Sequence, residues 1–148
     1  WRNRDWCCGY KIWERVTQGL PVLPIGDTKG LSTPAKDVDE LVMFYQKAGI
    51  FINTSTISPV PSALLEAMSC GCPVVSTATC MIPEFIIDGY NGFITNDEEQ
   101  MRERLILLFK NPKLAAQLGQ NARKTIETEF SIQRFTNDWN TLFKKVLR

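Results

Sequence analysis

The 148-residue chain contains no histidine, and its five cysteines do not form repeated Cys-x-x-Cys pairs. Structural zinc sites usually need four cysteine or histidine ligands at such spacings, so zinc is disfavoured. We interpret the cysteines as small, mostly buried hydrophobic residues. Their odd number, and the close sequence spacing of two pairs, predict reduced thiols and a cytoplasmic location. They lie at Cys7, Cys8, Cys70, Cys72 and Cys80.

The sequence also lacks a long hydrophobic run and an excess of charge of either sign. No apolar stretch approaches the roughly 18 residues that cross a bilayer, so membrane association is not indicated. The 17 basic and 16 acidic residues nearly balance, which offers no support for nucleic-acid binding. A secretory leader is not expected, because no basic and apolar segment precedes a small-residue site. No Gly-x-Gly-x-x-Gly motif follows an apolar run, which disfavours a dinucleotide-dependent enzyme.

What the chain does contain is an alternation of short apolar runs with helical patterns, which is typical of an α/β domain with a parallel sheet. Four runs are predicted as strands, at residues 20–26, 49–54, 72–77 and 92–95. The last third is predicted to be helical. Capping residues mark the helix starts at Asp37 with Glu40, Asn96 with Glu99, Asn111 before Pro112, and Ser131.

The last helical pattern carries apolar side chains at helical spacing. They are Phe135, Trp139, Leu142 and Val146. Such a stripe predicts a helix face that packs against the core of the domain.

The stretch "SPVPSALLEAMSCGCPVVST", residues 58–77, places one carboxylate in an otherwise apolar helix. Ligands of parallel α/β sheets bind beyond the carboxyl ends of the strands, where the next helix begins. The free N–H groups of Ser62, Ala63 and Leu64 would suit a phosphate there. Glu66, one turn further, could accept both hydroxyls of a ribose. Alternatively, Glu66 complements the helix dipole, which is worth about 0.3–1 kcal/mol.

Two longer patterns resemble a known family. They are "LLEAMSCGCPVVST…IPEFIIDGYNGFIT", residues 64–95, and "LGQNARKTIETEFSIQRFTNDW", residues 118–139. Both resemble the C-terminal, donor-binding domain of GT-B retaining glycosyltransferases of the group 1, or family 4, type. The resemblance extends over residues 38–148 and is weak over residues 1–37. It implies a Rossmann-like parallel sheet flanked by helices, with extra C-terminal helices. Residues 1–148 would form one nucleotide-sugar-binding domain, a fragment of a two-domain enzyme.

The resemblance also implies roles for individual residues. Glu66 matches the second glutamate of the family's Glu-x7-Glu motif, which binds the donor ribose. The N–H groups of Ser62, Ala63, Leu64 and Leu65 would hold the phosphates. Arg2, Arg4 and Lys11 are candidates for the arginine and lysine that contact the diphosphate near the start of the domain. Enzymes of this type generally need no metal or other cofactor, so none is expected.

The chain departs from the family where the first glutamate should stand, eight residues before Glu66. Ser58 occupies that position and would face the donor sugar. A hydroxyl can hydrogen-bond a sugar, but it supplies no negative charge to an oxocarbenium-like centre. Three interpretations follow: an active subfamily with an altered motif, a changed donor, or a domain that binds without turnover.

The function implied by the resemblance is transfer of a hexose from a UDP-, GDP- or ADP-sugar to an acceptor hydroxyl, with retention. The acceptor, a sugar or glycan, would be held mainly by an N-terminal domain. The chain alone is therefore expected to catalyse little. The alternative is a Rossmann-like nucleotide-sugar-binding or interaction module that has lost the chemistry.

Overall fold

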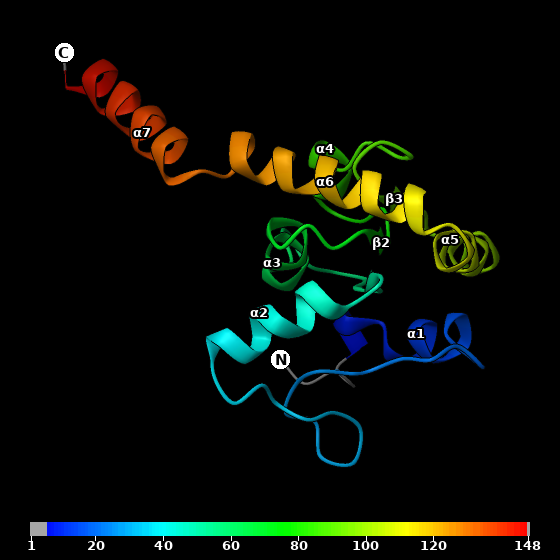
Figure 1. The fold of residues 1–148 in the computed structure, drawn as a ribbon. Coiled ribbons are helices and arrows are strands. Elements are labelled where there is room, and N and C mark those ends of the chain that lie inside the picture. Colours follow the sequence, from blue (N-terminus) through cyan, green and yellow to red (C-terminus); the bar gives the residue numbers. More distant parts are fainter. Residues whose placement is uncertain (1–5, 148) are drawn as a thin grey trace.

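Three short strands form a parallel sheet at the centre of residues 6–147, the part of the chain that the computed structural model describes (Figure 1). The strands are β1 (Phe51–Asn53), β2 (Val74–Ser76) and β3 (Phe93–Ile94). Their order is β1-β2-β3, with Phe51 opposite Val74 and Val75 opposite Phe93. The predicted α/β class with a parallel sheet is confirmed, although each strand is shorter than its apolar run.

Helices cover both faces of this sheet. Their bounds are η1 (Trp6–Cys8), α1 (Tyr10–Val16), α2 (Val38–Lys47), α3 (Ser62–Ser69), α4 (Ile82–Phe85), α5 (Glu98–Lys110), α6 (Pro112–Glu129) and α7 (Ile132–Val146). Val74 belongs to a buried cluster with α3, and Val75 to one with α5; consecutive strand residues point to opposite faces. The helices α2, α3 and α4 therefore lie on one face, and α1 and α5 on the other, as Figure 1 shows.

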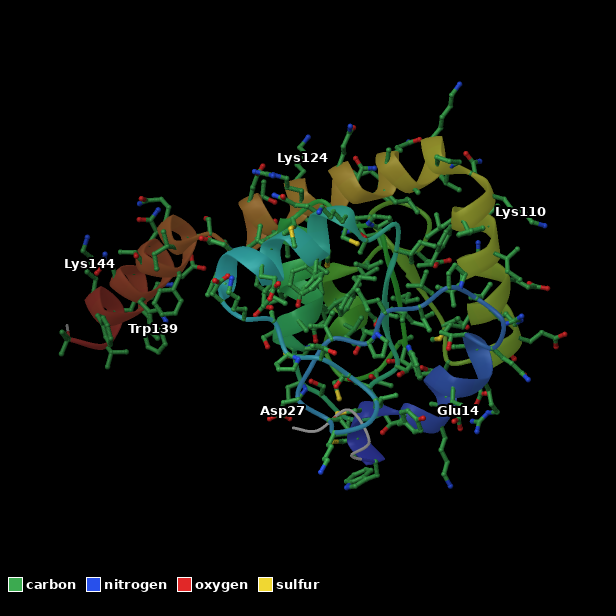
Figure 2. All side chains as sticks on the ribbon, turned by 60° about the horizontal axis from the view of Figure 1, so that its bottom comes forward. Glu14, Asp27, Lys110, Lys124, Trp139 and Lys144 are labelled. Atoms are coloured by element: carbon green, nitrogen blue, oxygen red, sulfur yellow. The ribbon has the colours of Figure 1, made fainter. Side chains whose placement is uncertain are left out.

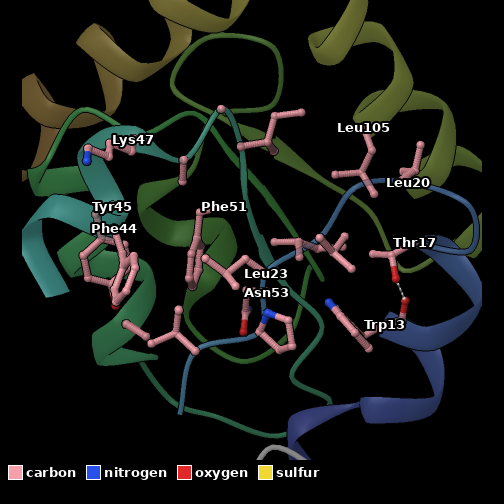
Figure 3. Close-up of a pocket in the computed structure, with 18 of the residues that line it drawn as sticks. Trp13, Thr17, Leu20, Leu23, Phe44, Tyr45, Lys47, Phe51, Asn53 and Leu105 are labelled. Carbon is pink, nitrogen blue, oxygen red and sulfur yellow. Dashed lines mark hydrogen bonds between the residues drawn. The ribbon is translucent and has the colours of Figure 1, made fainter. Parts of the chain in front are cut away.

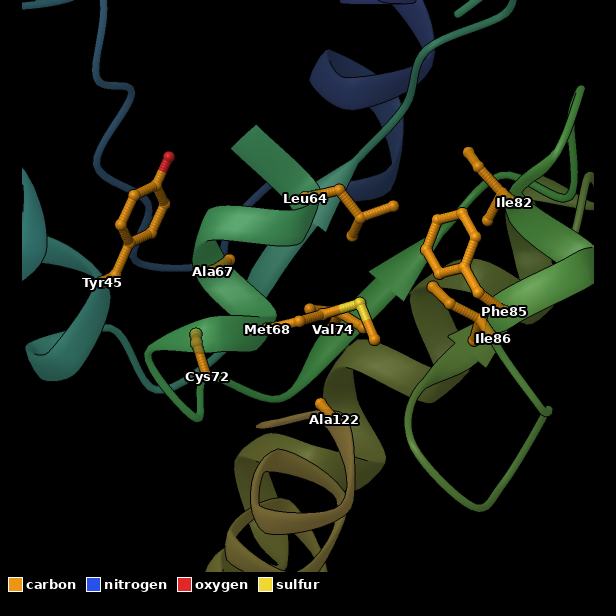
Figure 4. Close-up of a cluster of buried hydrophobic side chains, with 10 residues drawn as sticks. All are labelled: Tyr45, Leu64, Ala67, Met68, Cys72, Val74, Ile82, Phe85, Ile86 and Ala122. Carbon is orange, nitrogen blue, oxygen red and sulfur yellow. The ribbon is translucent and has the colours of Figure 1, made fainter. Parts of the chain in front are cut away.

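The core on the α3 side shows why α3 forms where it does (Figure 4). Leu64 and Met68 are one helical turn apart, and both are completely buried against Val74 and Ile86. Burying a side chain of this size stabilises the fold by about 1.5–3 kcal/mol. This apolar face fixes the rotation of α3 about its axis, and Glu66 is left on the exposed side.

Three of the four predicted helix caps are confirmed. Asp37, Asn111 and Ser131 each accept a hydrogen bond from the N–H three residues on. The fourth prediction, Asn96, is wrong by one residue, because Asp97 caps α5. Asn96 instead pairs its amide with the backbone of Ala78 and so ties the start of α5 to the loop after β2.

Helix α6 crosses the amino end of the sheet and contacts α3 more extensively than any other element does. At the crossing, a Cβ on Gly119 would lie 2.1 Å from the carbonyl oxygen of Gly71. Only glycine therefore permits this approach. Asn91 adds a second connection: it is buried, and its amide donates to Thr125 Oγ1 on α6 and to the Phe85 carbonyl.

The predicted strand at residues 20–26 is wrong. It forms an isolated bridge between Ile25 and Thr33, and within residues 6–147 it is not one of the strands of the sheet. Pro21 and Pro24 have no backbone N–H to donate to a neighbouring strand. Residues 20–26 also form no ladder with β1. The apolar pattern therefore lacks the partner strand that would make it part of the sheet.

The prediction that α7 packs into the core is also wrong. None of its residues is buried, and Phe135, Trp139, Leu142 and Val146 are 44–72% exposed. The helix extends away from the sheet in Figures 1 and 2, and in Figure 2 Trp139 and Lys144 lie together, well away from Glu14, Asp27 and Lys110. Its aromatic rings contact one another instead, with centroids 6.1 Å apart for Phe135 and Trp139. Helical spacing correctly predicted the stripe but not what covers it.

Across residues 6–147, every helix falls short of the length and apolar character that crossing a bilayer requires.

Candidate functional site

A buried network of polar side chains joins the carboxyl ends of β1 and β2. The Asn53 amide donates to Ser76 Oγ at 2.9 Å and accepts from Ser55 Oγ at 2.7 Å. Thr77 Oγ1 donates to the Ser55 carbonyl at 2.6 Å. These bonds fix the loop that leaves β1 toward α3. The structure thus builds a polar, rigid edge where parallel α/β sheets bind their ligands.

The start of α1 lies against the same edge. Gly9 has φ 66°, and a Cβ there would lie 1.7 Å from the Thr54 carbonyl oxygen. Thr54 Oγ1 donates to the Cys8 carbonyl at 3.0 Å. Lys11, the second residue of α1, is exposed. Its diphosphate role stays a prediction, and Arg2 and Arg4 lie outside the described residues.

The start of α3 follows the edge loop. Pro61 is its N-cap residue and has no side-chain cap to offer. The N–H groups of Leu64 and Leu65 donate to the Pro61 carbonyl, at 3.0 and 3.3 Å. In the described part of the chain, the backbone donors left open are therefore those of Ser62 and Ala63, two of the four predicted. The donor-binding role of all four residues stays a prediction.

Glu66 is the fifth residue of α3 and therefore lies beyond the first turn of the helix. The helix dipole acts most strongly within that first turn. Its Oε2 accepts a hydrogen bond from the Tyr45 hydroxyl at 3.0 Å. Tyr45 is buried on α2, and its ring packs edge-on against Phe51. Burial, and then the bond to Glu66, raise the pKa of Tyr45 well above its usual range, so the hydroxyl stays a donor. The carboxylate is therefore held by one oxygen, and within residues 6–147 the other oxygen makes no hydrogen bond.

Ser58 lies half-buried in the loop between β1 and α3. The neighbouring Pro59 carbonyl accepts from Met81 N–H at 3.3 Å, which ties this loop to the segment before α4. Cys80 in that segment has φ 51°, a left-handed conformation that glycine adopts most easily. The structure thus brings the loops of Ser58 and Cys80 together. The sugar-facing role of Ser58 stays a prediction.

A large apolar cavity, about 1280 Å³, runs along β1 on the side away from β2 (Figure 3). At its carboxyl end it reaches Asn53 and Ala63, and therefore touches the polar edge and the start of α3. Sequence reasoning missed this cavity. The signal that could have indicated it was the apolar run at residues 20–26, which forms its outer wall.

A parallel sheet covered by helices on both faces, with a polar carboxyl edge and a helix start beside it, defines a Rossmann-like ligand-binding domain. A family model described as glycosyl transferases group 1 matches residues 32–125, which is well over half of the chain. The chain belongs to the group 1 glycosyl transferase family.

Individual proteins agree with this assignment. The chain is 32% identical over 87 residues to the N-acetyl-alpha-D-glucosaminyl L-malate synthase of Bacillus anthracis, covering 57% of the chain and 23% of that enzyme. Among solved structures, sucrose-phosphate synthase from Thermosynechococcus elongatus superposes with a TM-score of 0.83 at 17% identity, covering 97% of this chain and 43% of that one. Anabaena HepE in complex with UDP and glucose gives 0.79 at 16% identity, covering 95% and 46%.

These two structures show that the fold is that of GT-B glycosyltransferases. The chain spans less than a third of the length of the first curated relatives it matches.

Proposed function

We propose that residues 1–148 are the donor-binding domain of a two-domain glycosyltransferase that transfers a hexose from a nucleotide sugar to a hydroxyl of an acceptor sugar or glycan, with retention. The observation that carries this proposal is the placement of Glu66. It lies one turn inside α3, on the exposed side of the helix, and Tyr45 holds one of its oxygens. A ribose diol offers two donors to such a carboxylate.

The neighbouring groups suit the rest of a nucleotide sugar. The N–H groups of Ser62 and Ala63 point outward from the helix start and would bind a phosphate oxygen, with Leu64 and Leu65 completing the first turn. The same donors would stabilise charge on the departing diphosphate. Ser58 would face the sugar. Lys11, with Arg2 and Arg4, would balance the diphosphate charge. No metal or other cofactor forms part of this proposal.

Two observations support a second, N-terminal domain as the partner. The relatives are more than three times as long as the region that this chain matches. The apolar face of α7 is exposed, and a monomeric domain rarely leaves so large a stripe uncovered. We place the enzyme in the cytoplasm because its five cysteines are free.

Titration calorimetry of the chain with UDP-, GDP- and ADP-glucose tests the proposal. UDP-glucose is the first choice, because HepE was solved with UDP and glucose. We expect saturable binding of one donor, and we expect Glu66→Gln to weaken it at least tenfold. The matched control is Glu103→Gln on α5, on the opposite face of the sheet, which should leave the affinity unchanged. Equal donor affinities for Glu66→Gln and Glu103→Gln would contradict the role of Glu66.

Ser58 favours a second candidate, a domain that binds the donor but no longer turns it over. Ser58→Glu in the longer protein separates the two. A gain in turnover would indicate a lapsed enzyme, whereas a loss would indicate a working site built around the hydroxyl.

A further inference from the structure

Two loops at the carboxyl edge of the sheet run side by side, one between β1 and α3 and the other between β2 and α4. These paired loops are residues 54–61 and 77–81. Near their beginning, the Ser55 carbonyl accepts a hydrogen bond from Thr79 Oγ1 at 3.1 Å. Further along, the Pro59 carbonyl accepts from Met81 N–H at 3.3 Å. The two loops therefore form one surface beside the start of α3.

The side chains that this surface presents to solvent are apolar. Ile57 is 55% exposed and Met81 is 45% exposed, and Pro59 also lies on the surface. Neither loop contains a charged residue. Single exposed apolar side chains are ordinary on a protein, but a group of them on adjoining loops marks a contact surface.

Both apolar side chains are held in place by the residues next to them. Thr56 precedes Ile57, and its N–H donates to the Cys7 carbonyl of η1 at 2.8 Å. Ile82 follows Met81 and is completely buried in the core, as Figure 4 shows. Because these contacts fix the backbone on each side, the apolar surface is formed before any ligand binds, as is usual for binding sites.

The proposed donor site indicates which group would lie against this surface. In that proposal the N–H groups of Ser62 and Ala63 hold the diphosphate, to which the sugar is covalently attached. The loop with Ile57 and Pro59 leads directly into this helix start, and Met81 is bonded to the same loop. A sugar hydroxyl placed there would lose its hydrogen bonds to water without replacement. A methyl group in the same place would gain free energy from burial.

We propose that the paired loops select a donor whose hexose carries a methyl group, with Ile57 and Met81 as the specificity-determining residues. Two kinds of hexose offer such a methyl: a 6-deoxyhexose at C6, and an N-acetylhexosamine in its acetamido group. The inference rests on the proposed function, because the sugar reaches these loops only if the start of α3 holds the diphosphate. Burial of one methyl group corresponds to an affinity gain of about fourfold.

Titration calorimetry of the 148-residue chain with UDP, UDP-glucose, UDP-6-deoxyglucose and UDP-N-acetylglucosamine tests this inference; if the donor screen selects guanosine or adenosine, the same series is used on that base. We expect one of the methyl-bearing donors to bind more tightly than the glucose donor by about fourfold or more, and its identity shows where the methyl lies. Equal or weaker binding of both, by a chain that binds the nucleoside diphosphate, would overturn the inference and leave the proposed function standing. A chain that binds none of the nucleotides would contradict both.

Met81→Ser and Ile57→Ser test whether these two side chains cause the preference. Both are exposed, so the fold should tolerate either change. We expect each variant to remove most of the preference for the methyl-bearing donor and to leave the affinity for the nucleoside diphosphate, which has no sugar, unchanged. Leu107→Ser is the matched control, because Leu107 is also exposed but lies on α5, on the opposite face of the sheet.

Two results would contradict the inference. One is an unchanged preference in both variants, which would leave the apolar surface to contact another part of the longer protein. The other is an equal loss of affinity for the nucleoside diphosphate and for every sugar donor, which would indicate that the two side chains only support the structure of the loops.

Discussion

The hydrogen bond from Tyr45 to Glu66 gives the sharpest test of the donor site, through the variant Tyr45→Phe. The variant keeps the ring that packs against Phe51 and removes only the hydroxyl. Losing one hydrogen bond to a carboxylate that is itself exposed should lower the free energy of unfolding by about 1 kcal/mol. Without the bond, Glu66 has rotamer freedom that it must lose again when it binds a diol. We expect the affinity for the ribonucleotide donor to fall about fivefold, which corresponds to about 1 kcal/mol.

The assay compares UDP-glucose with its 2′-deoxyribose analogue by calorimetry. Tyr45 should matter only when the diol is present, so Tyr45→Phe should reduce the preference for ribose and leave the affinity for the deoxy analogue unchanged. A purely structural role would weaken both ligands equally, and that result would refute the reasoning. Tyr90→Phe is the matched control, because Tyr90 is exposed in the loop between α4 and β3.

Three further predictions concern the framework of the site. Gly119→Ala places a methyl group against the Gly71 carbonyl and should cost about 3 kcal/mol in urea unfolding; an effect below 1 kcal/mol would show that α6 shifts freely. Asn91→Ala removes the hydrogen bonds that the buried Asn91 amide makes to the Ile87 N–H and the Phe85 carbonyl and should cost about 2–4 kcal/mol, with Asn121→Ala as a milder control. Burial raises the pKa of the Cys72 thiol from about 9 to about 12, so its contribution to stability is complete below pH 9 and is lost as the pH rises toward 12. Unfolding measured at pH 8, 9 and 10 should show a loss of about 1.4 kcal/mol at pH 10, and Cys72→Ala should flatten that slope.

Local patterns predicted the elements whose partners lie close in sequence or follow from capping chemistry. Asp37, Asn111 and Ser131 cap as predicted because the accepting side chain and the donating N–H are three residues apart. The strands that form β1 and β2 were predicted because a buried parallel strand needs a short apolar run. Asp97 replaces Asn96 as a cap because Asn96 finds a more distant partner in Ala78.

What the sequence could not predict depends on contacts between distant residues. The bond between Tyr45 and Glu66 joins residues 21 apart, on two different helices. The apolar runs at residues 20–26 and in α7 were recognised, but the first was predicted to be a strand and the second to pack into the core. Within residues 6–147, neither segment takes that place. Hydrophobic periodicity reports that a surface needs to be covered, and it carries no information on which segment covers it.

The separation of α7 from the sheet also affects how the chain unfolds. Helices of about 15 residues are only marginally stable in water unless a neighbour packs on them, and α7 has 15 residues. Its melting should therefore be gradual and uncoupled from the cooperative transition of the sheet. The free energy needed to complete the helix then becomes part of the binding free energy of whatever covers it. Substitutions on the solvent-facing side of α7 that raise helix propensity should tighten that association without touching the partner.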